Sequence, residues 1–360
     1  MKIIIDDMLL TKDTPTTAGS KMLDGYKSLF EATAVTKVRE SGFEIVGKSP
    51  VGEMAIDVCG ETCYTGKVDA AAALNGADAM LSFDVNGAPR RVAAQNGLVF
   101  IKPTYGIVSR FGTVSAACSG ECVGVMAKNT ADCKAVLSAI VGKDEKDGTM
   151  HADEVCKKAV SDTKEIKKVA LIGMGIDLSE ARAVLTASGI EVTEVDAGVI
   201  ESANAAWNIL MCAELCNNVS RFDGIKYGYR TPNYKNLDEL YTNSRTEAFG
   251  DLLKTAIIYG SDALSSANYM SKYDKSLRVR RVIVEALGKV LSEYDAIMLP
   301  VCSRKQYDGS ESAFVENKYT AVASISGLPA VVAGGVQVIG EAFTDGALLD
   351  LAKILNKEEK

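Results

Sequence analysis

The chain has 360 residues but only one histidine, one tryptophan and 7 prolines. A single histidine, His151, excludes a two-histidine metal site, and its polar surroundings argue against a Ser–His–Asp triad. No long basic run occurs, no apolar run reaches the roughly 18 residues of a membrane span, and the net charge is -7. We therefore expect a protein with no membrane span and no direct nucleic-acid binding.

The beginning of the chain, MKIIIDDMLL, also lacks the features of a secretory signal, because acidic residues directly follow its short apolar run. We expect a cytoplasmic protein. Cysteine, in contrast, is frequent: the chain has nine, an odd number. Thiols stay reduced in the cytoplasm, so these cysteines do not indicate a disulfide framework.

Strand-like apolar segments alternate with helical ones along the chain. Residues 2–6 and 98–104 read as strands, and residues 130–142 read as a helix that ends at a glycine. This order predicts an α/β fold, with a central, mostly parallel mixed sheet and helices on both faces. We expect one domain over 1–360, with a small βαβ lobe at about 165–200. No third glycine follows Gly173 and Gly175, so we interpret that segment as a turn and not a dinucleotide site.

Long motifs spread over the chain carry a resemblance to a known family. They include TTAGSKMLDGY at 16–26, AAQNGLVFIKPTYGIVSRFG at 93–112, AELCNNVSRFDGIKYGYR at 213–230 and ISGLPAVVAGGVQVIGEAF at 325–343. The chain resembles the amidase signature enzymes, and within them the A subunit of glutamyl-tRNA(Gln) amidotransferase. The resemblance implies the amidase signature fold and a protein partner subunit. It also implies that this chain is truncated, since it begins directly at the strand that carries the family lysine.

The family hydrolyses amides with a Ser–cis-Ser–Lys triad, and the resemblance places each member on this sequence. Ala88 stands at the nucleophile and Asp6 at the lysine. The Gly/Ser-rich loop that carries the cis-serine is missing between Gly60 and Ala73. An alanine cannot form an acyl-enzyme, so the resemblance implies that the triad is lost. The same matching predicts four residues that line the former cleft: Asp84, Asn86, Gly87 and Arg90.

The cysteines form three pairs with one shared spacing, C-x3-C, which on a helix places both thiols on the same face. The resemblance places all three pairs, and one further cysteine, beside the former active site. This suggests a metal site, with an iron–sulfur cluster preferred and zinc second. Packing of buried thiols and a redox role remain alternatives, in which case no cofactor is expected. The proposed ligands are Cys59, Cys63, Cys118, Cys122, Cys212, Cys216 and Cys302.

The sequence thus leaves three hypotheses for function. The first is a degenerate amidase homologue, not an active amidase, rebuilt around a cysteine-ligated metal site. The second is an amidotransferase A-type subunit or an amidase that acts on glutamine or another amide. The third is a non-catalytic scaffold that binds a partner through the old cleft.

Overall fold

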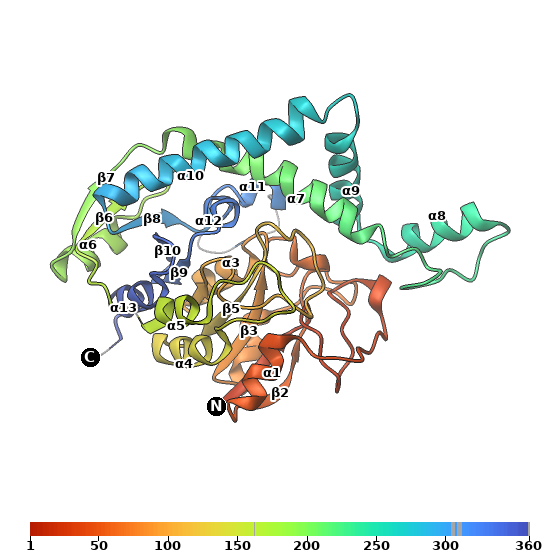
Figure 1. The fold of residues 1–360 in the computed structure, drawn as a ribbon, viewed down its shortest axis with the longest axis horizontal. Helices are drawn as coiled ribbons and strands as arrows, with labels where there is room; N and C mark the ends of the chain where they lie inside the picture. Colours follow the sequence, from red (N-terminus) through yellow and green to blue (C-terminus); the bar gives the residue numbers. More distant parts are fainter. Residues whose placement is uncertain (162, 304–306, 308–311, 359–360) are drawn as a thin grey trace.

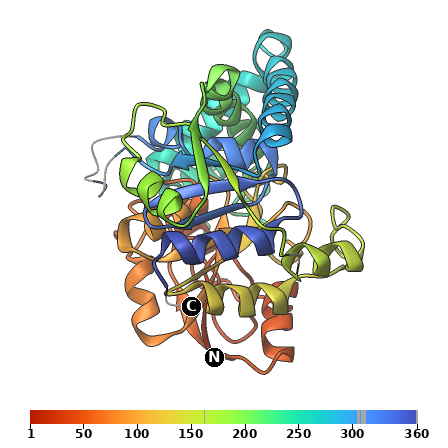
Figure 2. The same ribbon diagram turned by 90° about the vertical axis from the view of Figure 1, so that its left-hand side faces the viewer.

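A computed structural model describes residues 1–161, 163–303, 307 and 312–358. One ten-stranded sheet runs through the molecule in the order β2-β1-β3-β5-β4-β9-β10-β8-β6-β7 (Figures 1 and 2). The strands are β1 (Lys2–Asp6), β2 (Glu44–Ser49), β3 (Ala79–Asp84), β4 (Val99–Lys102), β5 (Cys122–Ala127), β6 (Lys168–Leu171), β7 (Glu191–Glu194), β8 (Ala296–Pro300), β9 (Ala330–Ala333) and β10 (Val336–Gly340).

The mixed α/β fold is confirmed, but parallel pairing does not extend across the sheet. The pairs at the two edges, β2-β1-β3 and β8-β6-β7, are parallel. Every pair from β3 to β8 is antiparallel. One reason is the tight turn at Gly334 and Gly335, both in the left-handed region, which joins β9 to β10 as a hairpin. Parallel neighbours need a long crossover connection, usually a helix, whereas the antiparallel strands of a hairpin are joined by a short turn.

Helices cover both faces of the sheet. They are α1 (Thr33–Glu40), α2 (Ala70–Ala73), α3 (Ala88–Asn96), α4 (Thr130–Ile140), α5 (Asp153–Ser161), α6 (Ser179–Ala187), α7 (Ala203–Val219), α8 (Leu237–Ala248), α9 (Asp251–Leu264), α10 (Lys275–Glu293), α11 (Ala313–Glu316), α12 (Ala321–Ser326) and α13 (Asp345–Leu355). Shorter turns are η1 (Lys21–Leu23), η2 (Glu53–Ala55), η3 (Leu74–Gly76), η4 (Gly198–Ser202) and the π-helical η5 (Met270–Asp274). None of the helices in the described residues combines the length and apolarity needed to cross a membrane.

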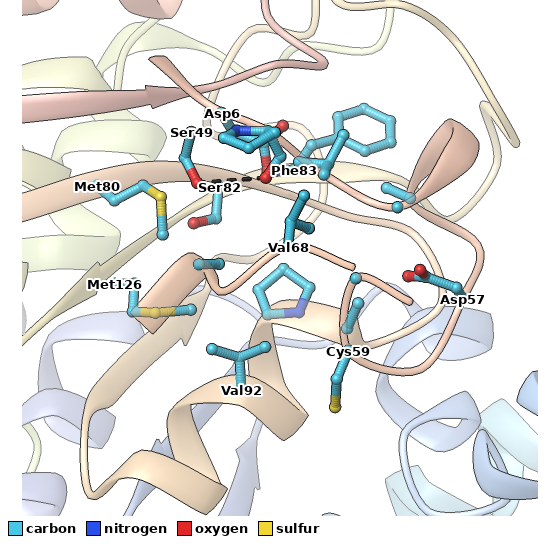
Figure 3. A pocket seen from close by; sticks show the side chains of 18 residues that line it. Asp6, Ser49, Asp57, Cys59, Val68, Met80, Ser82, Phe83, Val92 and Met126 are labelled. Atoms are coloured by element: carbon cyan, nitrogen blue, oxygen red, sulfur yellow. Dashed lines mark hydrogen bonds between the residues drawn. The ribbon is translucent and has the colours of Figure 1, made fainter. Parts of the chain in front are cut away.

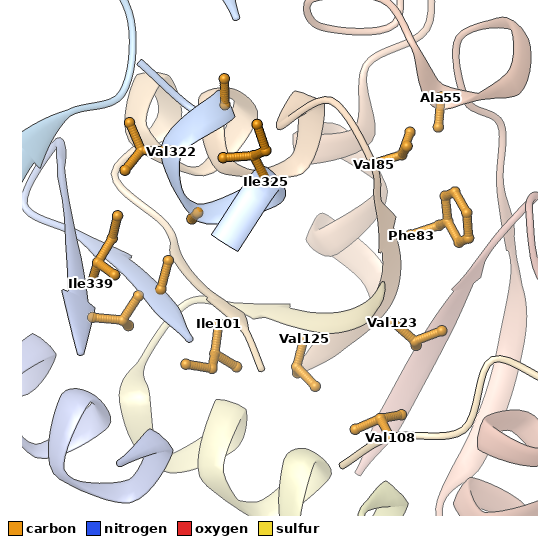
Figure 4. Packing of buried hydrophobic residues seen from close by; sticks show 14 of the residues in the cluster. Ala55, Phe83, Val85, Ile101, Val108, Val123, Val125, Val322, Ile325 and Ile339 are labelled. Carbon is orange, nitrogen blue, oxygen red and sulfur yellow. The ribbon is translucent and has the colours of Figure 1, made fainter. Parts of the chain in front are cut away.

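The central strands divide their side chains between two apolar layers, as the alternation of a strand requires. Met80, Phe100 and Met126 face the layer that contains α3. Their neighbours, which include Ile101 and Val125, face the layer on the α4 side, shown in Figure 4. Because both faces are covered, β3, β4 and β5 are buried along their whole length.

The predicted βαβ unit at about 165–200 is formed by β6, α6 and β7. Its strands extend the main sheet through the pairing of β6 with β8. The division into a single domain with a small lobe stays a prediction. In Figure 1, α7 and α10 run along one side of the molecule and α8 projects away from its body.

Candidate functional site

The segment that would carry the family nucleophile is a tight turn between β3 and α3. Helix α3 begins at Ala88, directly after this turn. Gly87 precedes the helix with a φ of 86°, a left-handed conformation that favours glycine. A side chain at this position would also meet the Cβ of Thr320 at 2.4 Å. The turn is therefore short because α12 closes directly over it.

A fully buried arginine holds this turn from inside. The guanidinium Nε of Arg90 donates to Asp84 Oδ2 at 2.7 Å, and both side chains are 0% exposed. The two Nη atoms donate at 2.7 Å to the carbonyl of Thr320 and to Ser324 Oγ. Asp84 Oδ1 accepts the backbone N–H of Gly87 at 2.9 Å. Strand β3, the turn and α12 are tied together by charge-assisted hydrogen bonds.

A second buried arginine, Arg91, ties the turn to the segment before α2. It donates to the carbonyls of Val58 at 3.0 Å and Asn86 at 2.9 Å, and to Thr320 Oγ1 at 2.8 Å. The Asn86 side chain donates to the carbonyl of Ile56 at 2.7 Å. We call Asp84, Asn86, Gly87, Arg90 and Arg91 the arginine clamp.

The predicted role of four of these residues is corrected by this geometry. Asp84, Asn86, Gly87 and Arg90 do not line the cavity beside Ala88. Their polar groups point into the clamp, because a buried charge or amide needs several hydrogen-bond partners. They support the turn and do not face an open cleft.

A small cavity does lie beside Ala88, and Asp6 lines it as well (Figure 3). The two residues at the predicted lysine and nucleophile positions therefore meet at one place. The cavity measures about 40 Å³. An engineered cavity of roughly 150 Å³ binds benzene, so this one has room for water and is small for an amide substrate. Its other described lining residues are Ser49, Pro50, Val51, Gly52, Ala55, Asp57, Cys59, Gly60, Val68, Ala70, Met80, Ser82, Phe83, Pro89, Val92 and Met126.

The Asp6 carboxylate is hydrogen-bonded to the backbone of two neighbouring segments. Its Oδ1 accepts the N–H of Met8 at 2.7 Å and its Oδ2 accepts the N–H of Phe83 at 3.0 Å. Burial raises the pKa of Asp6 to about 7, against the lowering effect of these two hydrogen bonds. The next residue, Asp7, pairs with Lys48 at 2.9 Å. A cation is thus present nearby, but it binds Asp7 and does not line the cavity.

Two buried polar residues that the sequence analysis missed also line the cavity. Ser82 is 1% exposed and Asp57 is 0% exposed. In the described part of the chain, the Ser82 hydroxyl and Asp57 Oδ1 have no hydrogen-bond partner. Burial raises the pKa of Asp57 to about 6. The signal in the sequence was weak: each residue is a polar side chain within a largely apolar segment, MLSFDV for Ser82 and MAIDVC for Asp57.

Glu53 connects one wall of the cavity to the helical layer. Its Oε1 accepts from Ser20 Oγ at 2.6 Å and its Oε2 accepts the N–H of Gly250 at 2.9 Å, directly before α9. Burial raises the pKa of Glu53 to about 7, and the hydrogen bonds from Ser20 and Gly250 and the charge of Lys254 offset only part of this rise.

The prediction that seven cysteines surround one metal site is wrong. Within residues 1–161, 163–303, 307 and 312–358, no group of three or more His, Cys, Asp or Glu side chains is placed to hold a metal ion. Cys59 is the only one of the seven that lines the cavity. Cys118 lies at the surface beside Ser115, and Cys216 contacts Ser261 on α9. The remaining proposed ligands belong to no such group either: Cys63, Cys122, Cys212 and Cys302.

Burial dominates the surroundings of three of these thiols. It raises the pKa of Cys59, Cys122 and Cys212 to about 12 in each case. Cys212 and Cys216 share one side of α7 because Gly260 of α9 packs against that side, where an added Cβ would meet the Cys212 carbonyl oxygen at 2.0 Å. For this pair, the spacing places two small side chains at a close contact between helices, whereas neither of the other two pairs lies on a helix.

Comparison with known proteins agrees with this fold and site. The family model described as Amidase matches residues 1–75 and 68–349. The chain is 33% identical to the A subunit of the glutamyl-tRNA(Gln) amidotransferase of Clostridium botulinum (strain Langeland), over 97% of this chain and 81% of that protein. It is 35% identical to the protein of the same name from Latilactobacillus sakei, over 96% and 80%. The chain belongs to the Amidase family.

Solved structures give the same result for the fold. The A subunit of the glutamyl-tRNA(Gln) amidotransferase of Thermotoga maritima superposes with a TM-score of 0.78 at 27% identity, over 100% of this chain and 83% of that one. A structure described as an amidase also superposes with a TM-score of 0.78, over 100% and 85%, at 22% identity. The second likeness concerns the fold alone.

Proposed function

We propose that this chain is an amidotransferase subunit of the A type. The observation that carries the proposal is its likeness to the A subunits over nearly the whole chain, at 33% and 35% identity. The arginine clamp supports it, because the turn that presents the catalytic position in this family is intact and fully hydrogen-bonded here. A partner subunit is part of the proposal, since the relatives are themselves named as subunits.

We further propose that the chain does not hydrolyse amides at this position. Ala88 offers a methyl group to the cavity and Asp6 offers a carboxyl group already bound to the backbone. The family match divides at residues 68–75, where the Gly/Ser-rich loop is expected to be missing. Without that loop, the site lacks the amides that would stabilise an oxyanion. This supports a binding or structural role within an assembly.

The nine free thiols support a cytoplasmic location as part of the same proposal. The proposal includes no metal or cluster, because the described residues contain no group of three or more His, Cys, Asp or Glu side chains placed to hold one. A pure scaffold without amidotransferase partners is the remaining alternative.

Two measurements test the proposal separately. For the assembly, the tagged chain is purified from its native cells, and the mass of the complex and the identity of its components are determined. We expect a stoichiometric complex with another amidotransferase subunit, and a chain that is monomeric throughout contradicts this. For the chemistry, glutamate release from glutamine is measured beside the Latilactobacillus sakei protein in its own complex. We expect background turnover, and turnover that persists through purification contradicts the loss of hydrolysis.

A further inference from the structure

The cavity beside Ala88 is covered on one side by a short segment between β2 and the arginine clamp. This segment, residues 50–55, begins directly after Ser49, the last residue of β2. It ends before Ile56, whose carbonyl accepts from Asn86 of the clamp at 2.7 Å. We call residues 50–55 the cover segment. Four of its residues line the cavity: Pro50, Val51, Gly52 and Ala55.

Two consecutive residues of the cover segment have strained backbones. Met54 and Ala55 have φ values of 54° and 55°, in the left-handed region that residues other than glycine rarely adopt. Both side chains are buried. The N–H of Met54 donates at 2.9 Å to the carbonyl of Ala18, which also has a positive φ. Such strain persists only where surrounding contacts hold the backbone, and it is frequent in segments that switch between conformations. The closed position of the cover segment therefore depends on its anchors.

Glu53 anchors the cover segment to the helical layer. Its carboxyl is 3% exposed and accepts from the Ser20 hydroxyl at 2.6 Å and from the Gly250 N–H at 2.9 Å. Both donors are uncharged. The charged groups that act on Glu53 lie on α9, where Lys254 pairs with Asp251 at 3.6 Å. The anchor is thus a pair of neutral hydrogen bonds to a buried carboxyl group.

The protonation state of this anchor changes near neutral pH. Because burial raises the pKa of Glu53 to about 7, the carboxyl is mostly neutral at pH 6 and mostly ionised at pH 8. A buried carboxylate gains hydration when it moves into water. Asp57 also lines the cavity, and burial and the charge of Glu61 raise its pKa to about 6. Arg91 donates to the Asp57 carbonyl at 3.1 Å. Both raised pKa values favour a more open state as the pH rises.

We propose that the cover segment is a pH-controlled flap, which closes the cavity while the Glu53 carboxyl is protonated and opens it once that carboxyl is ionised. Opening also releases the strain at Met54 and Ala55. The arginine clamp holds the carbonyls of Ile56 and Val58 and so limits the movement to the cover segment. The proposal does not rest on the proposed function, because it concerns a movement of the chain itself.

Hydrogen–deuterium exchange of the purified chain measures this opening. Exchange of the cover-segment amides is compared at pH 6 and pH 8, and each rate is divided by that of an unstructured peptide at the same pH. A carboxyl whose pKa is 4.5 in the open state and about 7 in the closed state raises the opening constant about tenfold between these pH values. We expect a rise of at least about fivefold, and no rise overturns the proposal.

Strand β5 is the reference for this measurement, because its amides are buried in the centre of the sheet. The opening constant of the cover segment should exceed that of β5 at least about a hundredfold at both pH values, since local opening costs less than global unfolding. Equal constants would mean that the segment opens only when the whole protein unfolds, and would overturn the proposal.

Methionine oxidation shows whether the cavity itself becomes accessible. Met80 is 2% exposed and lines the cavity on the side away from Asp57 (Figure 3). A thioether does not titrate in this pH range, so dilute hydrogen peroxide measures access to Met80. We expect its sulfoxide to form at least about fivefold faster at pH 8 than at pH 6, and at least about tenfold faster than that of Met298, buried in β8. Equal rates for Met80 at the two pH values overturn the proposal.

Three variants assign the opening to its cause. Glu53→Gln cannot ionise, so the rise between pH 6 and pH 8 should fall below about threefold, with the remainder due to Asp57. Glu44→Gln, at an exposed position of β2, is the control and should keep the full rise. Ala55→Gly keeps the carboxyl and removes strain, so it should lower the opening constant at least about twofold at both pH values. A full rise in Glu53→Gln, or faster opening of Ala55→Gly, overturns the proposal.

Discussion

The arginine clamp and the cavity beside Ala88 lie on two sides of the same turn, yet they differ in how well their polar groups are satisfied. In the clamp, Arg90 and Asp84 meet several hydrogen-bond partners at 2.7–2.9 Å. In the cavity, the Ser82 hydroxyl and one oxygen of Asp57 have no partner in the described residues. Buried polar atoms without partners are rare in folded proteins. The clamp follows this usual pattern of satisfied polar groups, and the cavity departs from it.

The difference shows which part of a catalytic site a fold needs. The clamp fixes the path of the chain between β3 and α3 and ties it to α12, so its loss would disturb the core. The residues that face the cavity enclose only a small volume. Asp6 is the exception, because its oxygens accept the N–H groups of Met8 and Phe83 and so belong to the framework. Chemistry can therefore change while the architecture around it persists.

Breaking the clamp should have the largest effect. Arg90→Met removes the guanidinium and leaves the Asp84 carboxylate buried without its cation. Loss of one partner from a buried ion pair costs about 3–5 kcal/mol. We expect the free energy of unfolding, measured by urea titration, to fall by that amount.

A double variant and a surface variant control this experiment. Asp84→Asn combined with Arg90→Met should cost less than the two single changes together, because no unpaired charge remains. Arg281→Met breaks an exposed pair with Glu285 on α10 and should cost less than about 0.5 kcal/mol. Equal losses for Arg90→Met and Arg281→Met would mean that the clamp does not hold the fold.

Glu53 should make the stability of the folded protein depend on pH. Its carboxyl has a pKa near 4.5 in the unfolded chain and about 7 in the folded protein. Between these values the folded state keeps a proton that the unfolded chain releases, so stability decreases as the pH rises from 4.5 to 7. Glu53→Gln cannot ionise, and its amide can still accept from Gly250 and donate to Ser20. We expect the variant to be more stable than the wild type at pH 8 by about 2–3 kcal/mol.

The pH profile of unfolding supplies the check on Glu53. At pH 4.5 the two proteins should be equally stable, because Glu53 is then protonated in the folded state. Glu285→Gln, an exposed change on α10, should leave the profile unaltered. An unchanged profile for Glu53→Gln would show that this carboxyl is not the one that titrates.

The fold was predicted well from the sequence, because long motifs and apolar periodicity both reflect the strands and helices that build the core. The strand at KIIID and the helix from Thr130 follow directly from local patterns. A mixed sheet was predicted, but the extent of its antiparallel centre was not, since strand direction depends on pairing between distant segments and not on local composition. The helix start at Ala88 was also missed, because it depends on α12 closing over Gly87.

The cavity brings together the two positions that the family match singled out, whereas the described residues contain no cysteine cluster. Asp6 and Ala88 were placed by matching to the family, and they do line one cavity. The cysteine spacing suggested a shared ligand, but equal spacing within three segments says nothing about the distance between them. Ser82 and Asp57 were missed because a single polar residue in an apolar segment gives no sign of whether its side chain has a partner.

The smallest expected effect comes from restoring the hydroxyl alone. Ala88→Ser adds one oxygen at the edge of a cavity of about 40 Å³, which has room for it. We expect the free energy of unfolding to change by less than about 1 kcal/mol, similar to Ala94→Ser at a partly exposed position of the same helix. Glutamate release from glutamine should remain at background. A serine needs a base to activate it, and here the Asp6 oxygens already accept two backbone N–H groups. On the proposed loss of the Gly/Ser-rich loop, its amides would be absent as well. Clear turnover by Ala88→Ser would show that another residue supplies the base, and that the cavity side has kept more of its chemistry than the arginine clamp alone implies.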